Sequence, residues 1–180
     1  MAFLTLYSLL LEQLRVLYGA ETHLTKALPR LIEGVASSEL KSLLTQHLEE
    51  TEDQLERLDI VATQLHEKLA GQRCRVVEGL MREAAELTER RGDERILDAA
   101  VIGVMRIVES YERSSYEIAR GLLEVLGEAE ALKAIDRNLL EENRCEQSMT
   151  VLFEDIIDSV HALPHHAPSP AASEESPSAG

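Results

Sequence analysis

Four segments of this chain repeat apolar residues at the spacing of one helical face, and each segment also places a glutamate on that face. With one histidine, the polar residues on these faces are Glu21, His47, Glu50, Glu109, Glu112 and Glu142. An ionised carboxylate in a protein core costs several kcal/mol unless a counter-charge lies beside it, and a group of carboxylates facing one another would repel. We therefore expect a cation among them, and a pair of divalent metal ions inside a helical bundle is the economical candidate.

The first two predicted helices follow from the apolar repeats and from cap signals. The first covers roughly residues 3–34; Pro29 is expected to kink it or to break it near its end, and Gly34 to stop it. The second begins at the cap signal Ser37–Ser38 and ends before Gly71.

A long connection separates the second and third helices. Residues 72–95 hold a short amphipathic helix over about residues 76–87. The third long helix runs from about residue 94 to 126, where Gly127 stops it, and the fourth covers about residues 128–161. The fold class is therefore all-α: a four-helix bundle with a short extra helix in the long connection, which permits a crossover.

The length of 180 residues suits one domain and a tail. We expect residues 1–161 to form the helical bundle. Residues 162–180 are rich in Pro, Ala, Ser and His and bury too little apolar surface to offset the entropy of ordering, so we expect a disordered tail.

Charge and cysteine content exclude several classes of function. Acids outnumber bases 33 to 18, which gives a formal net charge of −15 and argues against binding to nucleic acid or to anionic lipid. The apolar run at residues 3–11 has no basic leader and is followed by Glu12 and Arg15, so we expect neither a signal peptide nor a membrane span. Cys74 and Cys145 form no CxxC pair, which fits the reducing cytoplasm.

The spacing of the polar residues suits a two-metal site. Residues three apart on a helix lie one above the other, so His47 with Glu50, and Glu109 with Glu112, can each address one site. Bridging carboxylates hold two ions about 3.5 to 4 Å apart. Ligands that are mostly oxygen favour iron(II) or manganese(II) over zinc.

Five short stretches follow one another in a characteristic order. They are Tyr18–Pro29 (YGAETHLTKALP), His47–Gln54 (HLEETEDQ), Asp98–Ala100 (DAA), Glu109–Tyr116 (ESYERSSY) and Leu140–Glu142 (LEE). In this order and spacing they resemble the YciE/YciF family of ferritin-like bacterial proteins, over roughly residues 6–157. The resemblance implies a ferritin-like four-helix bundle with an extra short helix, a homodimer, a rubrerythrin-like pair of metal ions and an association with bacterial stress.

The resemblance also implies a role for individual residues. The carboxylate ligands would be Glu21, Glu50, Glu109, Glu112 and Glu142, and the imidazole ligand His47. Glu146 stands where relatives often have Asp, and would either bind metal or support the ligands. Ser110 stands where relatives often have His, but it lies off the apolar face.

Further residues near these positions have predicted roles of their own. Gln54 is expected to hydrogen-bond a ligand, because an amide is a weak metal donor. Cys145 is interpreted as a buried, inert thiol and Glu141 as an outward-facing residue. The remaining tyrosines near the motifs are interpreted as core residues: Tyr18, Tyr111 and Tyr116.

Two functional hypotheses from different classes remain open. In the first, a cytoplasmic protein binds two iron or manganese ions and reacts with dioxygen or hydrogen peroxide as an oxidoreductase in stress protection. This function needs a separate electron donor, because the chain has no rubredoxin-like CxxC module. In the second, a non-catalytic helical dimer sequesters metal or has a structural role. Storage of a mineral core is a third possibility that the sequence neither supports nor excludes.

Overall fold

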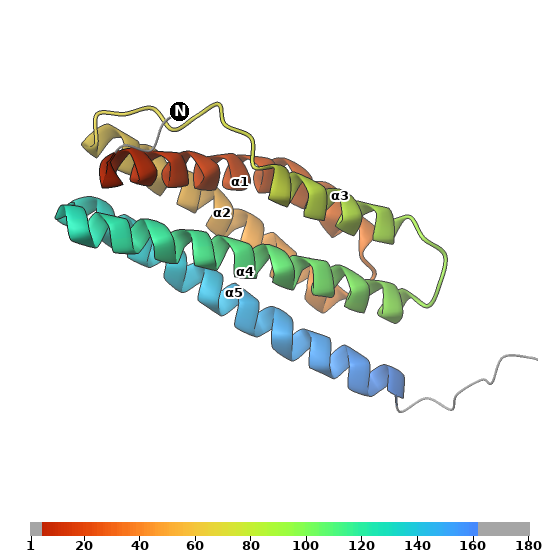
Figure 1. Cartoon of the computed structure of the whole chain (residues 1–180). Coiled ribbons are helices and arrows are strands. Elements are labelled where there is room, and N and C mark those ends of the chain that lie inside the picture. Colours follow the sequence, from red (N-terminus) through yellow and green to blue (C-terminus); the bar gives the residue numbers. More distant parts are fainter. Residues whose placement is uncertain (1–4, 162–180) are drawn as a thin grey trace, which may run out of the picture.

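The computed structural model describes residues 5–161, and these residues form five α-helices and no β-strand (Figure 1). The helices are α1 (Leu6–Gly34), α2 (Ser38–Gln64), α3 (Arg75–Thr88), α4 (Glu94–Leu126) and α5 (Ala129–His161). The four long helices form a bundle, and α3 packs on α1 and α4. The predicted all-α bundle with a short helix in the second connection is confirmed. The predicted tail lies outside the described residues.

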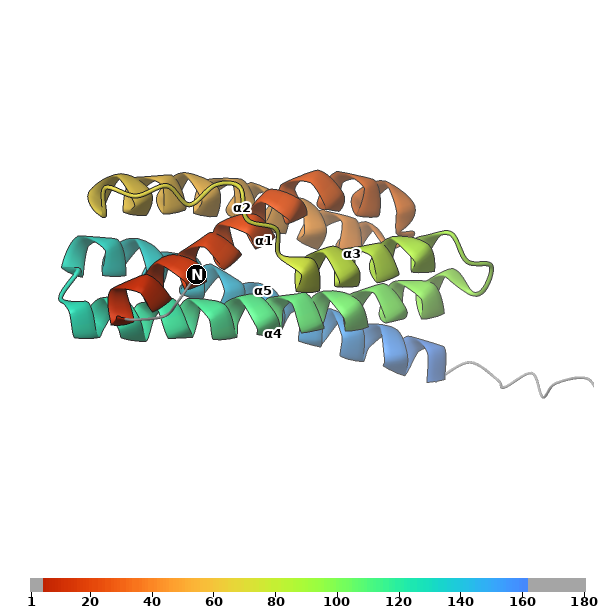
Figure 2. The same cartoon turned by 45° about the horizontal axis from the view of Figure 1, so that its top comes forward.

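The connections set the direction of each helix. Short turns join α1 to α2 and α4 to α5, so the helices of each pair are antiparallel (Figure 1). The connection over residues 65–93 returns along the length of the bundle before α4 begins, and α4 therefore runs in the same direction as α2 (Figures 1 and 2). This is the crossover that the length of the connection permitted. It places α1 beside α2 and α4, and α5 beside α4 and α2.

Local signals place the helix ends. The side chain of Ser37 accepts the backbone N–H of Leu40 and caps α2, and Gly127 ends α4 in the left-handed conformation with φ 76°. The carboxylate of Asp98, buried in α4, accepts the N–H groups of Ala36 and Ser37 at 3.0 and 2.7 Å. Asp98 therefore links the connection between α1 and α2 to helix α4.

Proline does not break α1. The helix continues through Pro29 and ends at Gly34, the predicted stop. Proline removes one backbone hydrogen bond, but the apolar face goes on past it with Leu31, which is 2% exposed. Packing of that face holds the last turn of α1 in place.

The hydrophobic core is divided into two clusters along the length of the bundle. One cluster includes Leu24, Leu28, Val108 and Met149, and the other includes Leu14, Leu17, Leu58 and Ile135. Buried polar residues separate the clusters at mid-length. This polar layer contains Glu21, His47, Thr51, Gln54, Glu109, Glu112, Ser115, Asn138 and Glu142. No described helix is long and apolar enough to cross a membrane.

Candidate metal centre

The polar layer gathers five of the seven predicted metal ligands from four helices. Their side chains are between 0% and 1% exposed: Glu21 of α1, His47 of α2, Glu109 and Glu112 of α4, and Glu142 of α5. The helical faces that carry these residues are apolar above and below the polar layer, so burying the apolar residues of each face buries the acids as well. The predicted convergence of acids in the interior is therefore present in the structure.

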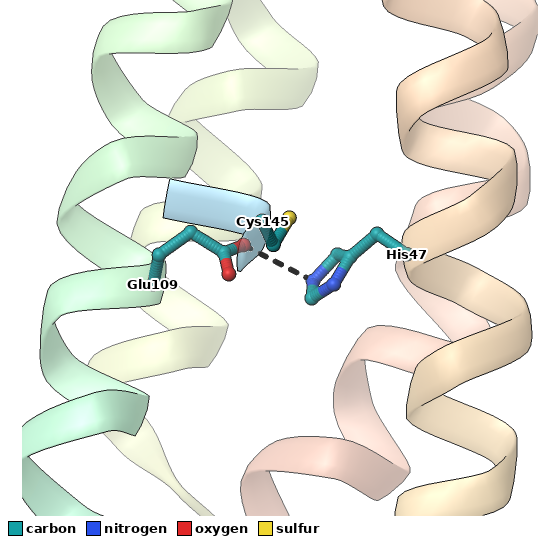
Figure 3. A group of neighbouring side chains, drawn as sticks. All are labelled: His47, Glu109 and Cys145. Carbon is teal, nitrogen blue, oxygen red and sulfur yellow. Dashed lines mark ion pairs between the residues drawn. The ribbon is translucent and has the colours of Figure 1, made fainter. Parts of the chain in front are cut away.

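Donor atoms in this layer form two overlapping groups. In the first, one donor atom each of Glu109, Glu112 and Glu142 lies within 4.8 Å of the others. In the second, the same holds for His47, Glu109 and Cys145 (Figure 3). Glu109 belongs to both groups, so its carboxylate lies between an all-oxygen group and a mixed one.

Several donor atoms of the candidate ligands lack hydrogen-bond partners within the described part of the chain. Among the candidate ligands, seven buried atoms have no hydrogen-bond partner in the described residues: Oε2 of Glu21, Nε2 of His47, both oxygens of Glu109, both oxygens of Glu112 and Oε2 of Glu142. Nε2 of His47 lies 3.1 Å from Oε1 of Glu109, but the two atoms lack hydrogen-bond geometry. Buried polar groups in native proteins are otherwise almost always satisfied, and an unsatisfied one costs about 1–3 kcal/mol. A cation bound in the layer would satisfy these atoms.

Burial shifts the pKa values of the candidate ligands. Burial, followed by the charges of the neighbouring glutamates, raises the pKa of Glu21, Glu109 and Glu112 well above the usual range. Burial likewise raises the pKa of Glu142 to about 7. Burial lowers the pKa of His47 to about 4, so its imidazole is neutral at physiological pH. Without a cation, burial favours the protonated form of these carboxyl groups.

Two ligand candidates are held by neighbours. Nε2 of Gln54 donates to Oε1 of Glu142 at 2.6 Å, which confirms the predicted hydrogen-bonding role of Gln54. The hydroxyl of Tyr116 donates to Oε1 of Glu21 at 2.5 Å. Tyr116 is fully buried as predicted, but its hydroxyl has a defined role that the interpretation as a core residue did not include. In both glutamates the second oxygen is left for another partner.

Two predicted ligands lie at the edge of the layer. Glu50 is half-buried, and its Oε1 accepts a hydrogen bond from Gln46 at 3.0 Å. Glu146 is also half-buried; its carboxylate accepts from Ser110 at 3.2 Å and pairs with Arg113 at 3.3 Å. Neither belongs to the two groups of donor atoms. Their roles as ligands stay predictions.

One prediction about α5 is wrong. Glu141 was expected to face outward, but it is 8% exposed, and its carboxylate pairs with Arg57 and, at 3.3 Å, with Arg137. The buried face of α5 includes Asn138, Glu141 and Cys145, whereas Glu146, which was predicted to bind or support the metal, is only half-buried. The two guanidinium groups compensate the charge of Glu141 and so lower the free-energy cost of burying it.

Comparison with known proteins identifies the family. A family model, described as a domain of unknown function, DUF892, matches residues 5–162. This chain belongs to the DUF892 family.

Relatives of this DUF892 protein include characterised structures. Protein YciF of Escherichia coli K12 is 36% identical over 136 residues, which cover 75% of this chain and 82% of YciF. The crystal structure of the E. coli stress protein YciF matches with a TM-score of 0.83 and 33% identity, covering 86% of this chain and 98% of that one. YcfI of Rhodopseudomonas palustris, proposed to be a structural protein, matches with a TM-score of 0.77 and 38% identity, covering 81% and 93%. The resemblance to the YciE/YciF family is confirmed.

Sequence reasoning missed two buried polar residues of this DUF892 protein. Nε of Arg57 donates to Oδ1 of Asn138 at 2.5 Å, and Nδ2 of Asn138 donates to the hydroxyl of Tyr116 at 3.0 Å. Since Tyr116 donates to Glu21, a chain of hydrogen bonds runs from Arg57 to a candidate ligand. The sequence held a signal for both residues: Arg57 lies three residues after Gln54, and Asn138 four before Glu142.

The Arg57→Met variant is expected to lower the free energy of unfolding by about 3 kcal/mol, because it removes the buried cation that pairs with Glu141. The carboxylate keeps only the more exposed Arg137 and a hydrogen bond of 3.4 Å from Gln54. Chemical denaturation of wild type and variant measures the loss. The double variant Arg57→Met with Glu141→Leu removes both charges and should recover most of it. A double variant as unstable as the single one would show that Arg57 acts through something other than this ion pair.

Proposed function

We propose that this protein holds two divalent metal ions, iron or manganese, in the centre of its helical bundle and uses them in a reaction with dioxygen or hydrogen peroxide. The observation that carries the proposal is the set of seven buried donor atoms without partners, contributed by all four long helices and collected in one layer. A core that needed only to be filled would place apolar side chains at these positions.

The negative charges of the layer equal the positive charges of two divalent ions. Glu21, Glu109, Glu112 and Glu142 carry four negative charges when ionised, and His47 is neutral. Two divalent ions carry four positive charges, so the loaded layer would be neutral within a low-dielectric interior. Carboxylate oxygens with one imidazole are ligands that iron(II) and manganese(II) accept.

The protein's own residues shape the layer. Gln54 and Tyr116 fix one oxygen each of Glu142 and Glu21 and leave the second oxygen of each glutamate directed elsewhere. The two hydrophobic clusters on either side keep bulk water from the layer. A bound redox-active pair would supply the electrons for reduction of the oxidant.

The role in stress is taken from the family. The E. coli relative is called a stress protein, and we propose the same context for this chain. The homodimer and the separate electron donor belong to the same proposal and stay predictions.

The alternative function is non-catalytic: sequestration of metal, or a structural role with protonated acids in the core. One relative, YcfI, is proposed to be a structural protein. The raised pKa values of the buried glutamates are compatible with a protein that folds without metal. Metal binding and metal oxidation separate the alternatives.

Anaerobic titration of chelator-treated protein with iron(II) is expected to saturate at two equivalents per chain. Binding to the folded state alone should raise the free energy of unfolding by about 3 kcal/mol per site at a hundredfold excess over Kd. Mixing the loaded protein with hydrogen peroxide in a stopped-flow spectrophotometer should then oxidise the iron faster than the same iron free in buffer.

The outcomes separate the hypotheses. Tight binding of two ions with oxidation no faster than in buffer supports sequestration and contradicts the oxidant reaction. No binding, in wild type and in a Glu154→Gln control that removes an exposed charge from α5, supports the structural role.

A further inference from the structure

One side of the metal centre brings together three kinds of donor atom. His47 comes from α2, Glu109 from α4 and Cys145 from α5, and these side chains are 1%, 0% and 4% exposed. Figure 3 shows the imidazole and the carboxylate pointing toward one another, with the thiol beside the carboxylate. The three donor atoms lie within 4.8 Å of one another, so one ion can reach all three.

Two of these side chains direct unpartnered atoms into the group. Nε2 of His47 and both oxygens of Glu109 are buried and have no hydrogen-bond partner among the described residues. The separation of 3.1 Å between Nε2 and Oε1 of Glu109 is close to the roughly 3 Å expected for two donors bound to one ion at about 2.1 Å and at right angles. The geometry therefore fits two ligands of a common ion.

The position of Cys145 in α5 supports the same reading. Cys145 lies three residues after Glu142, so the two side chains lie one above the other on the buried face of the helix. In dimetal carboxylate bundles, a glutamate is paired with a histidine at this spacing. Here a sulfur atom stands in the place of an imidazole.

We propose that Cys145 binds one ion of the pair through its sulfur, so that the two metal positions are chemically unequal. This inference rests on the proposed function, because it requires ions in the layer. The first position is formed by His47, Glu109 and Cys145, and the second by Glu109, Glu112 and Glu142, with Glu109 shared. On binding, the thiol releases its proton to solvent and the sulfur binds as a thiolate.

Unequal ligands give unequal preferences for metal. Thiolate and imidazole donors suit zinc and related borderline ions, whereas three carboxylates suit manganese(II) or iron(II). The first position is therefore expected to bind a borderline ion, iron(II) or zinc, more tightly than the second position, which is expected to prefer manganese(II). Cys74, the other buried cysteine, lies outside both groups of donor atoms and serves as the matched control.

Cobalt(II) is a suitable probe, because a thiolate ligand gives it a charge-transfer absorption in the near ultraviolet. Chelator-treated wild type, Cys145→Ser and Cys74→Ser proteins would be titrated with cobalt(II), with bound cobalt measured separately by elemental analysis. We expect the absorption in wild type and Cys74→Ser, and its loss in Cys145→Ser. Offered zinc and manganese together, wild type should bind one of each, and Cys145→Ser should bind zinc at least about tenfold more weakly.

Failure of this inference is distinguishable from failure of the proposed function. Bound cobalt without the absorption in wild type, or with the absorption still present in Cys145→Ser, overturns the sulfur ligand and leaves the dimetal layer intact. No cobalt bound to wild type overturns both. If Cys145→Ser does not fold, X-ray absorption of zinc-loaded wild type decides: sulfur in the first coordination shell supports the inference, and only oxygen and nitrogen there contradicts it.

Discussion

Metal-free protein is expected to lose stability as the pH rises from about 4.5 through 7. Burial raises the pKa of Glu142 from its ordinary 4.5 to about 7, so in this window the folded protein holds a proton that the unfolded chain releases. The stabilisation is complete below pH 4.5 and is lost as the pH passes through 7. One pKa unit is worth about 1.4 kcal/mol, so Glu142 alone removes about 3 kcal/mol from the free energy of unfolding.

The other buried acids extend the effect in the same direction. Burial and the charges of neighbouring glutamates also raise the pKa values of Glu21, Glu109 and Glu112 well above the usual range, so these groups lower stability in the same direction as the pH rises. Denaturation of chelator-treated protein between pH 4.5 and 9 measures the slope. The Glu142→Gln variant should have a shallower slope between pH 4.5 and 7, whereas Glu154→Gln, which removes an exposed charge, should not. Stability that rises with pH in metal-free wild type would contradict the burial of these acids.

Replacing Glu112 by glutamine is expected to have opposite effects with and without metal. Glu112 is fully buried, and neither of its oxygens has a hydrogen-bond partner. In metal-free protein at pH 8, Glu112→Gln removes an acid that burial disfavours, and the free energy of unfolding should rise. In the presence of manganese(II), the same change removes a ligand, and metal affinity should fall by at least about a hundredfold.

Thermal unfolding at pH 8, with chelator and with manganese(II), measures both effects on one pair of proteins. The Tm of Glu112→Gln should exceed that of wild type in chelator and fall below it in manganese(II). If Glu112 has only a structural role, the difference in Tm between Glu112→Gln and wild type should have the same sign in chelator and in manganese(II). Glu154→Gln should follow wild type in both.

Much of the fold was predictable because apolar residues recur at helical spacing along each long helix. The predicted bounds of the third helix, about residues 94 to 126, agree with α4 at Glu94–Leu126, because a cap at Asp93 and a glycine at Gly127 mark both ends. A break at Pro29 was not found, because the effect of proline on α1 depends on tertiary packing that the sequence does not state; a kink there stays a prediction.

The sequence predicted which helical faces carry the candidate site, but it did not fix the exact rotation of each helix. Glu21, His47 and Glu142 lie among apolar residues that fix the direction of the face. Glu50 and Glu146 lie one position from Thr51 and Cys145, which occupy the interior instead. One residue turns a helical side chain by about 100°, so a small error in the assumed face exchanges a buried residue for one at the edge.

The hydrogen-bond chain through Asn138 and Arg57 depends on which side chains meet between α2, α4 and α5. Helical periodicity places a residue on a face, but it does not state which residue of another helix lies opposite. That pairing follows from the relative positions of the helices in the bundle, and only coordinates supply it.

Anomalous diffraction from crystals grown with manganese(II) tests the central claim most directly. Two peaks are expected in the polar layer between the two hydrophobic clusters, each about 2.0–2.3 Å from oxygen or nitrogen atoms of Glu21, His47, Glu109, Glu112 or Glu142. A layer without an anomalous peak, in which these glutamates hydrogen-bond to one another as neutral acids at saturating manganese(II), would contradict the account.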